Sequence, residues 1–413
     1  MVVADAEAYD VVVGGGGPAG LAAAIELRRR KVQRVLVLER EPVAGGVPRH
    51  CGHSPFGMRE FGRVLLGPAY ARRLVERARV AGVDIRTGHA VVALGPGGRL
   101  VVATPDGPAA LAAGRVLLAT GVREASRHVR LISGDRPLGV LTTGTLQAMI
   151  HGRHLLPFRR PLVVGTELVG LSALLTCRGA RIRPVAMIEP ADRPTVRRAM
   201  MLLPWLLGIP VHLGAELVEI RGRRRVEGVL LRTADGRTLD LDCDGVLLTG
   251  HFLPEAALVG ASHLELDPGS GGPAVDQYGR CSDPAYYAAG NLLRPVETAG
   301  WSFREGGRVA GCIVDDLAGR LPRPSATLPI DRGHGVKLVV PQRLAMPLER
   351  CGGLRHLQLR VDRPVSGRLD LRADGVPIWR RRTSALPERR LLVPLADVRP
   401  PPATRRLEIG FDS

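Results

Sequence analysis

Short apolar runs alternate with a helix-like segment in residues 9–40, and this pattern predicts a strand–helix–strand unit. Residues 10–13 (DVVV) form a β-branched run that is typical of a buried parallel strand. Apolar and polar residues then recur at helical spacing in residues 21–30, and residues 35–38 (VLVL) predict a second strand. The same order of elements returns in residues 160–189, so we predict an internal duplication within an α/β fold.

A period of two marks the remaining segments. Residues 83–107 and 214–242 follow the two units and predict short antiparallel strands joined by glycine-rich turns. Beyond the proline-bearing stretch 319–333, short alternating segments such as HLQLRV and RLDLRAD begin at about Val336. These segments predict a small all-β domain near the end of the chain.

The most apolar stretch is residues 200–211 (MMLLPWLLGIPV), which two prolines interrupt. It is shorter than the roughly 20 residues that span a bilayer, so we predict a buried helix and turn there and no membrane span. Residues 1–10 (MVVADAEAYD) carry no basic region before an apolar core, so we expect no signal peptide and a cytoplasmic protein.

Charge adds little to this picture. The formal net charge is +18, and all basic residues except Lys31 and Lys337 are arginines. They are scattered along the chain, and aromatic residues that could stack on bases make up only 3% of it. We therefore expect no nucleic-acid partner.

The first glycine-rich turn carries the clearest chemical signal. Gly15, Gly17 and Gly20 match G-x-G-x-x-G between a strand and a helix, and Glu39 ends the next strand 19 positions after Gly20. In such a unit the glycines permit a tight turn, close approach of the backbone to a pyrophosphate, and close packing of helix on strand. The helix amides then face the phosphates, and the acid accepts hydrogen bonds from the ribose. The predicted dinucleotide site also includes Pro18, Ala19 and Arg40.

The second turn departs from this pattern. In VVGTELVG (163–170), Gly165 and Gly170 are present, but Glu167 stands where the second glycine would be. Glu189 follows Gly170 by 19 positions, as Glu39 follows Gly20. Because Glu167 places bulk and charge where a backbone should meet phosphate, we predict a retained fold with a lost nicotinamide site. The alternative is that its side chain turns outward and a nucleotide binds in a shifted position.

Cysteine spacing argues against metal and disulfide chemistry. The six cysteines, at positions 51, 177, 243, 281, 312 and 351, include no C-x-x-C pair and no cluster with histidine. This spacing favours a reduced chain with no metal site and no redox cysteine pair.

Three segments resemble the two-dinucleotide-fold flavoproteins, the superfamily of thioredoxin and glutathione reductases: GGGGPAG (14–20), LLATGVRE (117–124) and YYAAGNLL (286–293). The resemblance implies FAD as cofactor, with Thr120 and Gly121 where the chain returns along it. It also implies that Gly290 and Asn291 lie at the ribityl chain and flavin. Asn291 replaces the usual aspartate there, and its carbonyl can still accept a hydroxyl hydrogen bond.

More narrowly, the chain is similar to FAD/NAD(P)-binding oxidoreductases associated with glycerol-3-phosphate and amino-acid (opine, hydroxyproline) dehydrogenase systems. The segments that carry this likeness are GGVPRHCGHSPFG (45–57), GPAYARRL (67–74), RPLGVLTTGTLQ (136–147) and GVKLVVPQR (335–343). The likeness implies two Rossmann-like domains of glutathione-reductase type and a small C-terminal all-β domain. We expect an FAD-binding domain in residues 1–125 and 251–325, a degenerate NAD-type domain in 126–250, and the β domain in 336–413.

The resemblance implies an FAD-dependent dehydrogenase that acts on a small amine, amino-acid or polyol-type substrate. Electrons would pass to a second dehydrogenase or electron-carrier subunit. Resemblance also places Cys51 and His53 near the flavin, as a nucleophile or proton relay, or as a buried thiol and a loop-ordering histidine. The alternatives are an NAD(P)H-dependent flavin reductase and a non-catalytic FAD-holding scaffold subunit.

Overall fold

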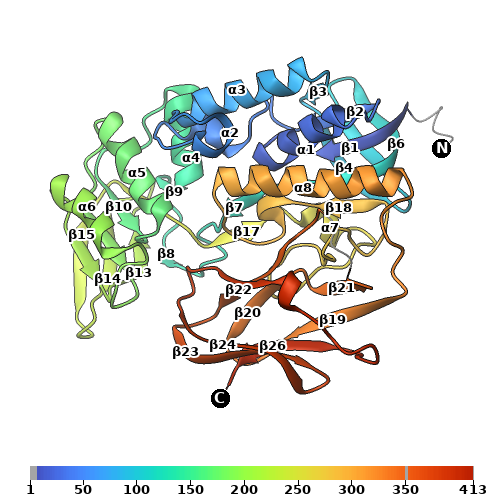
Figure 1. Ribbon diagram of the computed structural model, residues 1–413. Helices are drawn as coiled ribbons and strands as arrows, with labels where there is room; N and C mark the ends of the chain where they lie inside the picture. Colours follow the sequence, from blue (N-terminus) through green and yellow to red (C-terminus); the bar gives the residue numbers. More distant parts are fainter. Residues whose placement is uncertain (1–6, 349–351, 413) are drawn as a thin grey trace. The chain divides into compact units, whose positions relative to one another are not determined.

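The β-branched run near the start of the chain forms the central strand of a seven-stranded sheet (Figure 1). Strand β1 (Glu7–Gly14) pairs in parallel with β2 (Val35–Glu39) on one side and with β6 (Gly107–Leu118) on the other. β3 (Asp84–Thr87) continues the sheet beyond β2, and β18 (Tyr286–Ala288) pairs in parallel with the end of β6. The chain order reverses between β1 and β6, which is where open parallel sheets bind their ligands.

Two long helices pack together beside this sheet. They are α1 (Pro18–Arg29) and α8 (Ala299–Leu317), which lie side by side in Figure 1. A Cβ at Gly306 of α8 would overlap with the Ala19 carbonyl oxygen of α1, so the close crossing requires glycine there. α3 (Gly67–Val80) completes the long helices of this part of the chain.

The predicted antiparallel strands are largely confirmed. β4 (Ala90–Gly95) pairs antiparallel with β5 (Arg99–Thr104), and β5 pairs antiparallel with β6. The segment Asp84–Thr87 is different, because it joins β2 in parallel rather than forming a hairpin. After the second unit, three strands form the expected antiparallel meander: β13 (Glu216–Arg221), β14 (Gly228–Arg232) and β15 (Thr238–Asp242).

The second strand–helix–strand unit repeats the plan of the first. Its five-stranded sheet is parallel throughout, with order β12-β11-β10-β16-β9. Helix α5 (Leu168–Gly179) follows the central strand and covers the sheet. The strands are β9 (Val140–Thr142), β10 (Pro161–Val164), β11 (Ala186–Glu189), β12 (Val211–Leu213) and β16 (Gly245–Leu248). The shorter elements are α2 (Met58–Phe61), α4 (Thr143–Gln147), α6 (Leu202–Leu206), α7 (Ala257–Gly260), β7 (Val122–Glu124), β8 (Ser133–Gly134) and β17 (Phe252–Pro254).

The C-terminal part is strand-rich, as predicted, but it begins earlier in the chain than residue 336. β19 (Ala326–Arg332) belongs to its larger sheet, and Pro329 lies where the pairing of β19 passes from β21 to β26. This position tolerates proline inside a strand, although the proline weakens the strand signal in the sequence. The larger sheet has order β21-β19-β26-β23-β24 and the smaller has order β20-β22-β25. Their bounds are β20 (Val336–Val340), β21 (Arg343–Met346), β22 (His356–Val361), β23 (Val365–Ala373), β24 (Val376–Ala385), β25 (Leu391–Pro394) and β26 (Leu407–Phe411).

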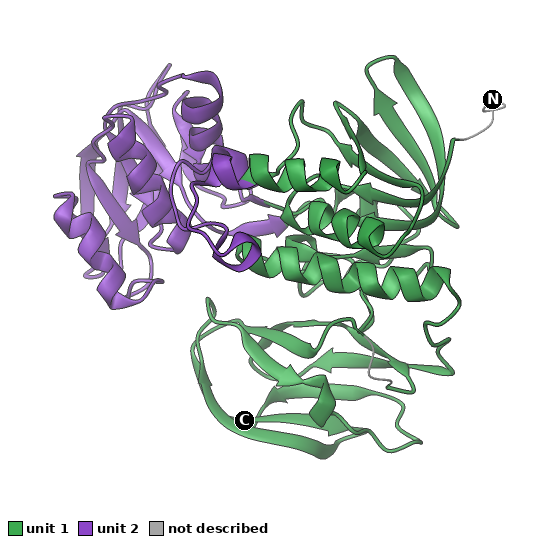
Figure 2. Ribbon diagram, turned by 45° about the horizontal axis from the view of Figure 1, so that its top comes forward, with its two compact units in different colours: residues 1–46, 71–122, 254–413 green, residues 47–70, 123–253 purple. Residues whose placement is uncertain are grey.

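This computed structural model describes residues 7–348 and 352–412. Residues 1–6, part of the segment from which we expect no signal peptide, and Cys351 lie outside that range. The chain divides into two compact units, shown in Figure 2: unit 1 contains residues 1–46, 71–122 and 254–413, and unit 2 contains residues 47–70 and 123–253. The domain boundaries given above follow cofactor roles rather than compactness, and they stay predictions.

The apolar stretch 200–211 is helical but not buried, so that prediction was wrong in part. In α6, Leu202, Trp205 and Leu206 have 56%, 73% and 65% of their surface exposed, and Pro204 is buried. A five-residue helix can turn only one side toward the core. No helix within residues 7–348 and 352–412 has the length and apolar character needed to cross a membrane.

Candidate functional site

Three turns meet at the carboxyl ends of neighbouring parallel strands in unit 1. The first follows β1, the second (residues 119–121) follows β6, and the third (residues 289–291) follows β18. An added Cβ at Gly15, whose φ is +116°, would lie 2.5 Å from the Ala119 carbonyl oxygen. A Cβ at Gly290 would lie 2.8 Å from the Ala19 Cβ. The structure therefore brings together the glycine turn, Thr120–Gly121 and Gly290–Asn291, and their contacts with a cofactor stay predictions.

The first turn leaves the start of α1 open to an anion. Gly17 is the N-cap residue, no side chain caps the helix, and Pro18 occupies the first helical turn. A Cβ at Gly17 would have only the Gly46 Cα within 4 Å, at 3.8 Å, so the protein itself does not fill the space beside it. A Cβ at Gly20 would overlap with the Gly15 carbonyl oxygen, which explains the third glycine. Free helix amides next to an uncrowded glycine fit a pyrophosphate.

Glu39 keeps hydrogen-bonding capacity for a ligand. It ends β2 and is 8% exposed. Its carboxylate accepts one hydrogen bond from the Gly16 N–H (3.1 Å) and one from the Glu41 N–H (3.0 Å). Because an ionised carboxylate has about four acceptor positions, about two remain for ribose hydroxyls. The adjacent Arg40 is exposed and forms an ion pair with Glu255 at 3.4 Å.

In the other two turns, protein groups satisfy part of the hydrogen-bonding capacity of the side chains. The Thr120 hydroxyl donates to the Glu255 carbonyl (2.8 Å) and can still accept. The Asn291 side chain donates to the Glu297 carbonyl (3.1 Å) and accepts from the Glu297 N–H (2.8 Å), so its carbonyl keeps one acceptor position. Beside Gly290, the buried Ser302 hydroxyl has no hydrogen-bond partner within the part of the chain that the structure describes. The hydroxyl groups of Thr120 and Ser302 and the side-chain carbonyl of Asn291 can therefore form hydrogen bonds with an FAD molecule.

In unit 2 the corresponding position is filled by Glu167. Its carboxylate accepts from the Thr249 hydroxyl at 2.7 Å, across the point where the strand order reverses between β10 and β16. A Cβ on Gly165 or Gly250 would overlap with this carboxylate, so the side chain packs against both turns. The side chain is turned inward and does not point to solvent. Burial raises the pKa of Glu167 against the opposing hydrogen bond from Thr249.

Glu189 differs from Glu39 in how its carboxylate is used. It accepts hydrogen bonds from the Thr166 N–H (3.1 Å), the Thr166 hydroxyl (2.5 Å), the Thr195 hydroxyl (3.1 Å) and the Ala191 N–H (3.3 Å). Four donors satisfy a carboxylate. Protein donors therefore fill the acceptor positions of Glu189, at the end of β11, whereas they fill only two of those of Glu39.

Cys51 and His53 lie in unit 2, in its 47–70 segment. The Cys51 thiol is buried and contacts the Gln147 side-chain carbonyl at 3.5 Å. Burial, with a smaller contribution from Glu124, raises its pKa to about 12, so this environment disfavours a thiolate nucleophile. His53 is partly exposed, and its Nδ1 lies 3.2 Å from the Ser54 carbonyl. Their proposed roles stay predictions.

The parallel sheet, the three converging turns and the open acceptor positions of Glu39 define a dinucleotide-binding protein. The chain belongs to the pyridine nucleotide-disulphide oxidoreductase family, whose model matches residues 9–306. Proteins of this family bind FAD, and FAD is the cofactor of this chain. Within the described ranges, Cys51, Cys177, Cys243 and Cys281 are buried and form no disulfide.

Comparison with known proteins gives relatives at low identity. The chain is 27% identical to the A subunit of opine oxidase from Agrobacterium tumefaciens (strain Ach5) over 386 residues, covering 85% of this chain and 70% of the relative. It is 29% identical to hydrogen cyanide synthase subunit HcnB of Pseudomonas aeruginosa over 389 residues, covering 84% and 80%. Thioredoxin reductase of T. acidophilum superposes with a TM-score of 0.64 at 23% identity, covering 76% of this chain and 99% of that one, which shows the shared fold.

Sequence reasoning missed a group of charged residues around the third turn. Arg294 and Glu305 are 1% and 3% exposed, and Arg360 and Arg390 reach the same region from the C-terminal strands. A carboxylate next to the glycine pair in REGGRVAG (304–311) is the one local signal that could have indicated Glu305. Arg360 and Arg390 are too distant along the chain for any local pattern to reveal them.

Replacing Gly17 tests the predicted anion site. The change Gly17→Ala should leave folding intact, because its φ of −85° suits alanine and no protein atom is crowded. The methyl group should weaken FAD binding by about 5- to 150-fold, which corresponds to a steric cost of about 1–3 kcal/mol. Gly179→Ala, with no atom within 4 Å of the added Cβ, is the matched control. Titration of the apoprotein with FAD measures both, and equal affinities would contradict this site.

The raised pKa of Cys51 makes a second prediction. At pH 8 a thiol with pKa about 12 has about a thousandth of the thiolate of one at the ordinary value of 9.0. Alkylation of Cys51 should therefore be at least about a thousandfold slower in the native protein than after unfolding, and should accelerate as the pH rises. Peptide mass spectrometry with a timed alkylation measures this rate. Rapid native alkylation at pH 8 would revive the nucleophile hypothesis.

Proposed function

We propose that this chain is the FAD-carrying subunit of a dehydrogenase that oxidises a small amine, amino-acid or polyol-type substrate. FAD, when bound, supplies two-electron redox chemistry. We propose that it is held by residues 15–20, Glu39 and Arg40, Thr120 and Gly121, and Gly290 and Asn291. Oxidation of a C–N or C–O single bond removes two electrons and two protons from the substrate. Electrons then leave to a partner subunit or carrier.

The observation that carries this proposal is the difference between the two acids. Glu39 has about two acceptor positions left for a ribose, whereas four protein donors satisfy Glu189. Glu167 also occupies the turn where a nucleotide phosphate would approach the backbone. A chain with one open and one closed dinucleotide site needs an electron source other than NAD(P)H. An organic substrate is the simplest source.

The relatives support a role within a complex. The matched opine oxidase and hydrogen cyanide synthase chains are each named as one subunit of an enzyme. Both likenesses cover more than four-fifths of this chain. This supports a partner that receives electrons. The name of the first relative also supports an amino-acid-derived substrate class.

The second candidate function is an NAD(P)H-dependent flavin reductase. The intact parallel sheet and the glycines Gly165 and Gly170 favour it, because the architecture of a nucleotide site is still present. Removal of Glu167 from the turn distinguishes the two candidates, since it opens the turn without changing the sheet.

Anaerobic stopped-flow with NADH and NADPH tests the closed second site. Wild-type flavin should be reduced slowly or not at all by either nucleotide, and promptly by a substrate from a panel of amines, amino acids and polyols. Glu167→Gly should tighten nicotinamide nucleotide binding by about 1–3 kcal/mol, because it removes a clash and a carboxylate. Glu167→Gln, which keeps the bulk and removes the acid, should stay close to wild type. Rapid reduction of the wild-type flavin by NADH or NADPH would establish the reductase instead.

His53 is the residue we propose as a proton acceptor for substrate oxidation. If it accepts the proton, His53→Ala should lower turnover by about 10²-fold or more, which is typical for loss of a general base. FAD content should not change. His212→Ala, an exposed histidine of the same unit, is the matched control. Turnover within about twofold of wild type would leave His53 as a residue that orders its loop.

A further inference from the structure

Two glutamates hold the turn that carries Gly290 and Asn291. Glu305 on α8 accepts from the Gly290 N–H at 2.9 Å. Glu297 is joined to the Asn291 side chain through its backbone, by one hydrogen bond in each direction. Each of the two residues proposed to meet the flavin end of FAD is therefore fixed by a neighbouring glutamate.

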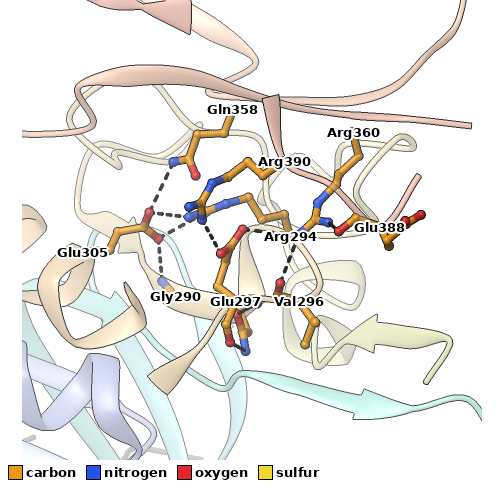
Figure 3. Close-up of polar contacts among 10 residues, drawn as sticks. Gly290, Arg294, Val296, Glu297, Glu305, Gln358, Arg360, Glu388 and Arg390 are labelled. Atoms are coloured by element: carbon orange, nitrogen blue, oxygen red, sulfur yellow. Dashed lines mark hydrogen bonds and ion pairs between the residues drawn. The ribbon is translucent and has the colours of Figure 1, made fainter. Parts of the chain in front are cut away.

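The C-terminal β domain supplies partners for both glutamates (Figure 3). On β22, Gln358 donates to the Glu305 carboxylate at 3.4 Å, and Arg360 forms an ion pair with Glu297 at 3.5 Å. Arg390, immediately before β25, forms a second ion pair with Glu297. Arg360 also donates to the Val296 carbonyl at 3.0 Å. Residues on and next to the strands of one small sheet thus contact the turn at Val296 and Glu297 and the carboxylate of Glu305 on α8.

Arg294 closes this network from within the turn itself. It is 1% exposed, and its two terminal nitrogens donate to Glu305 at 3.1 and 2.5 Å. Buried charges of this kind depend on each other, because removing one partner leaves another charge unpaired in a poorly solvated place. The shape of the turn therefore depends on groups that the β domain contributes.

The first turn of α8 offers unused donors next to this network. The Trp301 indole N–H and the Ser302 hydroxyl are buried, and neither has a hydrogen-bond partner within the described residues. Arg390 lies over the Trp301 ring, 3.6 Å from its centroid, so the β domain also fixes this part of the helix. Buried polar atoms without partners call for a ligand or water, and the Ser302 hydroxyl lies beside Gly290 of the FAD-holding turn.

We propose that the C-terminal β domain positions the flavin-binding turn 290–298, with Gln358, Arg360 and Arg390 as positioning residues. The inference rests on the proposed FAD contacts of Gly290 and Asn291 and adds a role for the β domain. The β domain acts through Glu305 and Glu297, and its residues make no contact with the reacting atoms. The domain is then needed for tight FAD binding and for the environment of the flavin.

The full-length apoprotein of several variants, titrated with FAD, tests this role. Arg390→Met removes an ion pair with Glu297 and the stacking on Trp301, and should weaken FAD binding at least about tenfold. Arg343→Met is the matched control, because Arg343 also links the β domain to the dinucleotide fold, through Glu265 at 2.9 Å, but away from the turn. It should leave FAD affinity within about twofold of wild type. Arg390→Lys, which keeps the charge, should recover part of the lost affinity.

Gln358→Met separates positioning from stability. The Gln358 carbonyl oxygen is buried without a partner among the described residues, so methionine should not lower the melting temperature of the apoprotein. The lost donor to Glu305 should still weaken FAD binding about threefold or more and shift the visible absorption band of bound FAD. Wild-type affinity and spectrum in both Arg390→Met and Gln358→Met would overturn the inference. If Arg390→Met does not fold, Gln358→Met alone decides. A wild-type protein that takes up no FAD would overturn the proposed function, and this inference with it.

Discussion

The rest of the structure depends on backbone-to-backbone contact at the carboxyl ends of β1, β6 and β18. A Cβ would overlap with a carbonyl oxygen at Gly20 and at Gly306, and Gly15 approaches the Ala119 carbonyl almost as closely. Because no side chain fits at these positions, helices α1 and α8 can meet directly at the point where the strand order reverses. Helix amides, the acid of β2 and the turn after β18 then converge at this edge of the sheet.

The same constraint operates in unit 2 with a different result. A Cβ at Gly170 would lie 2.8 Å from the Gly165 carbonyl, so the close packing of helix on turn is retained. The side chain of Glu167 nevertheless fills the crevice, and threonines satisfy Glu189. The turn keeps the first and third glycines, and Glu167 stands at the position of the second, where a phosphate would approach the backbone. The fold and the nucleotide site are therefore separable, which is why the function follows from the side chains.

Local patterns predicted most of what local physics determines. The strand–turn–helix units and the duplicated plan follow from apolar periodicity and glycine spacing, and the matched family confirms the fold. The sequence was a poorer guide where tertiary contacts determine the strand partner or the burial of a residue. Proline obscured β19 because the change of strand partner at Pro329 is invisible in sequence. The apolar run 200–211 suggested burial, although its short helix exposes Trp205. The Arg390–Glu297 pair spans 93 positions, so only the fold brings the two residues together.

The directionality of its hydrogen bonds explains the charged network between the β domain and the turn better than a contribution to folding stability does. Buried ion pairs often contribute little net stability, because desolvation offsets their attraction, and apolar residues could join the same surfaces as firmly. Apolar contacts are not directional, however, and would leave the Gly290 N–H without a defined acceptor. Glu305 provides this acceptor and is itself aimed by Arg294 and Gln358. A turn that must present a backbone to a flavin needs such orientation. The placement of charged residues in this poorly solvated region is therefore consistent with a requirement for geometry at the cofactor.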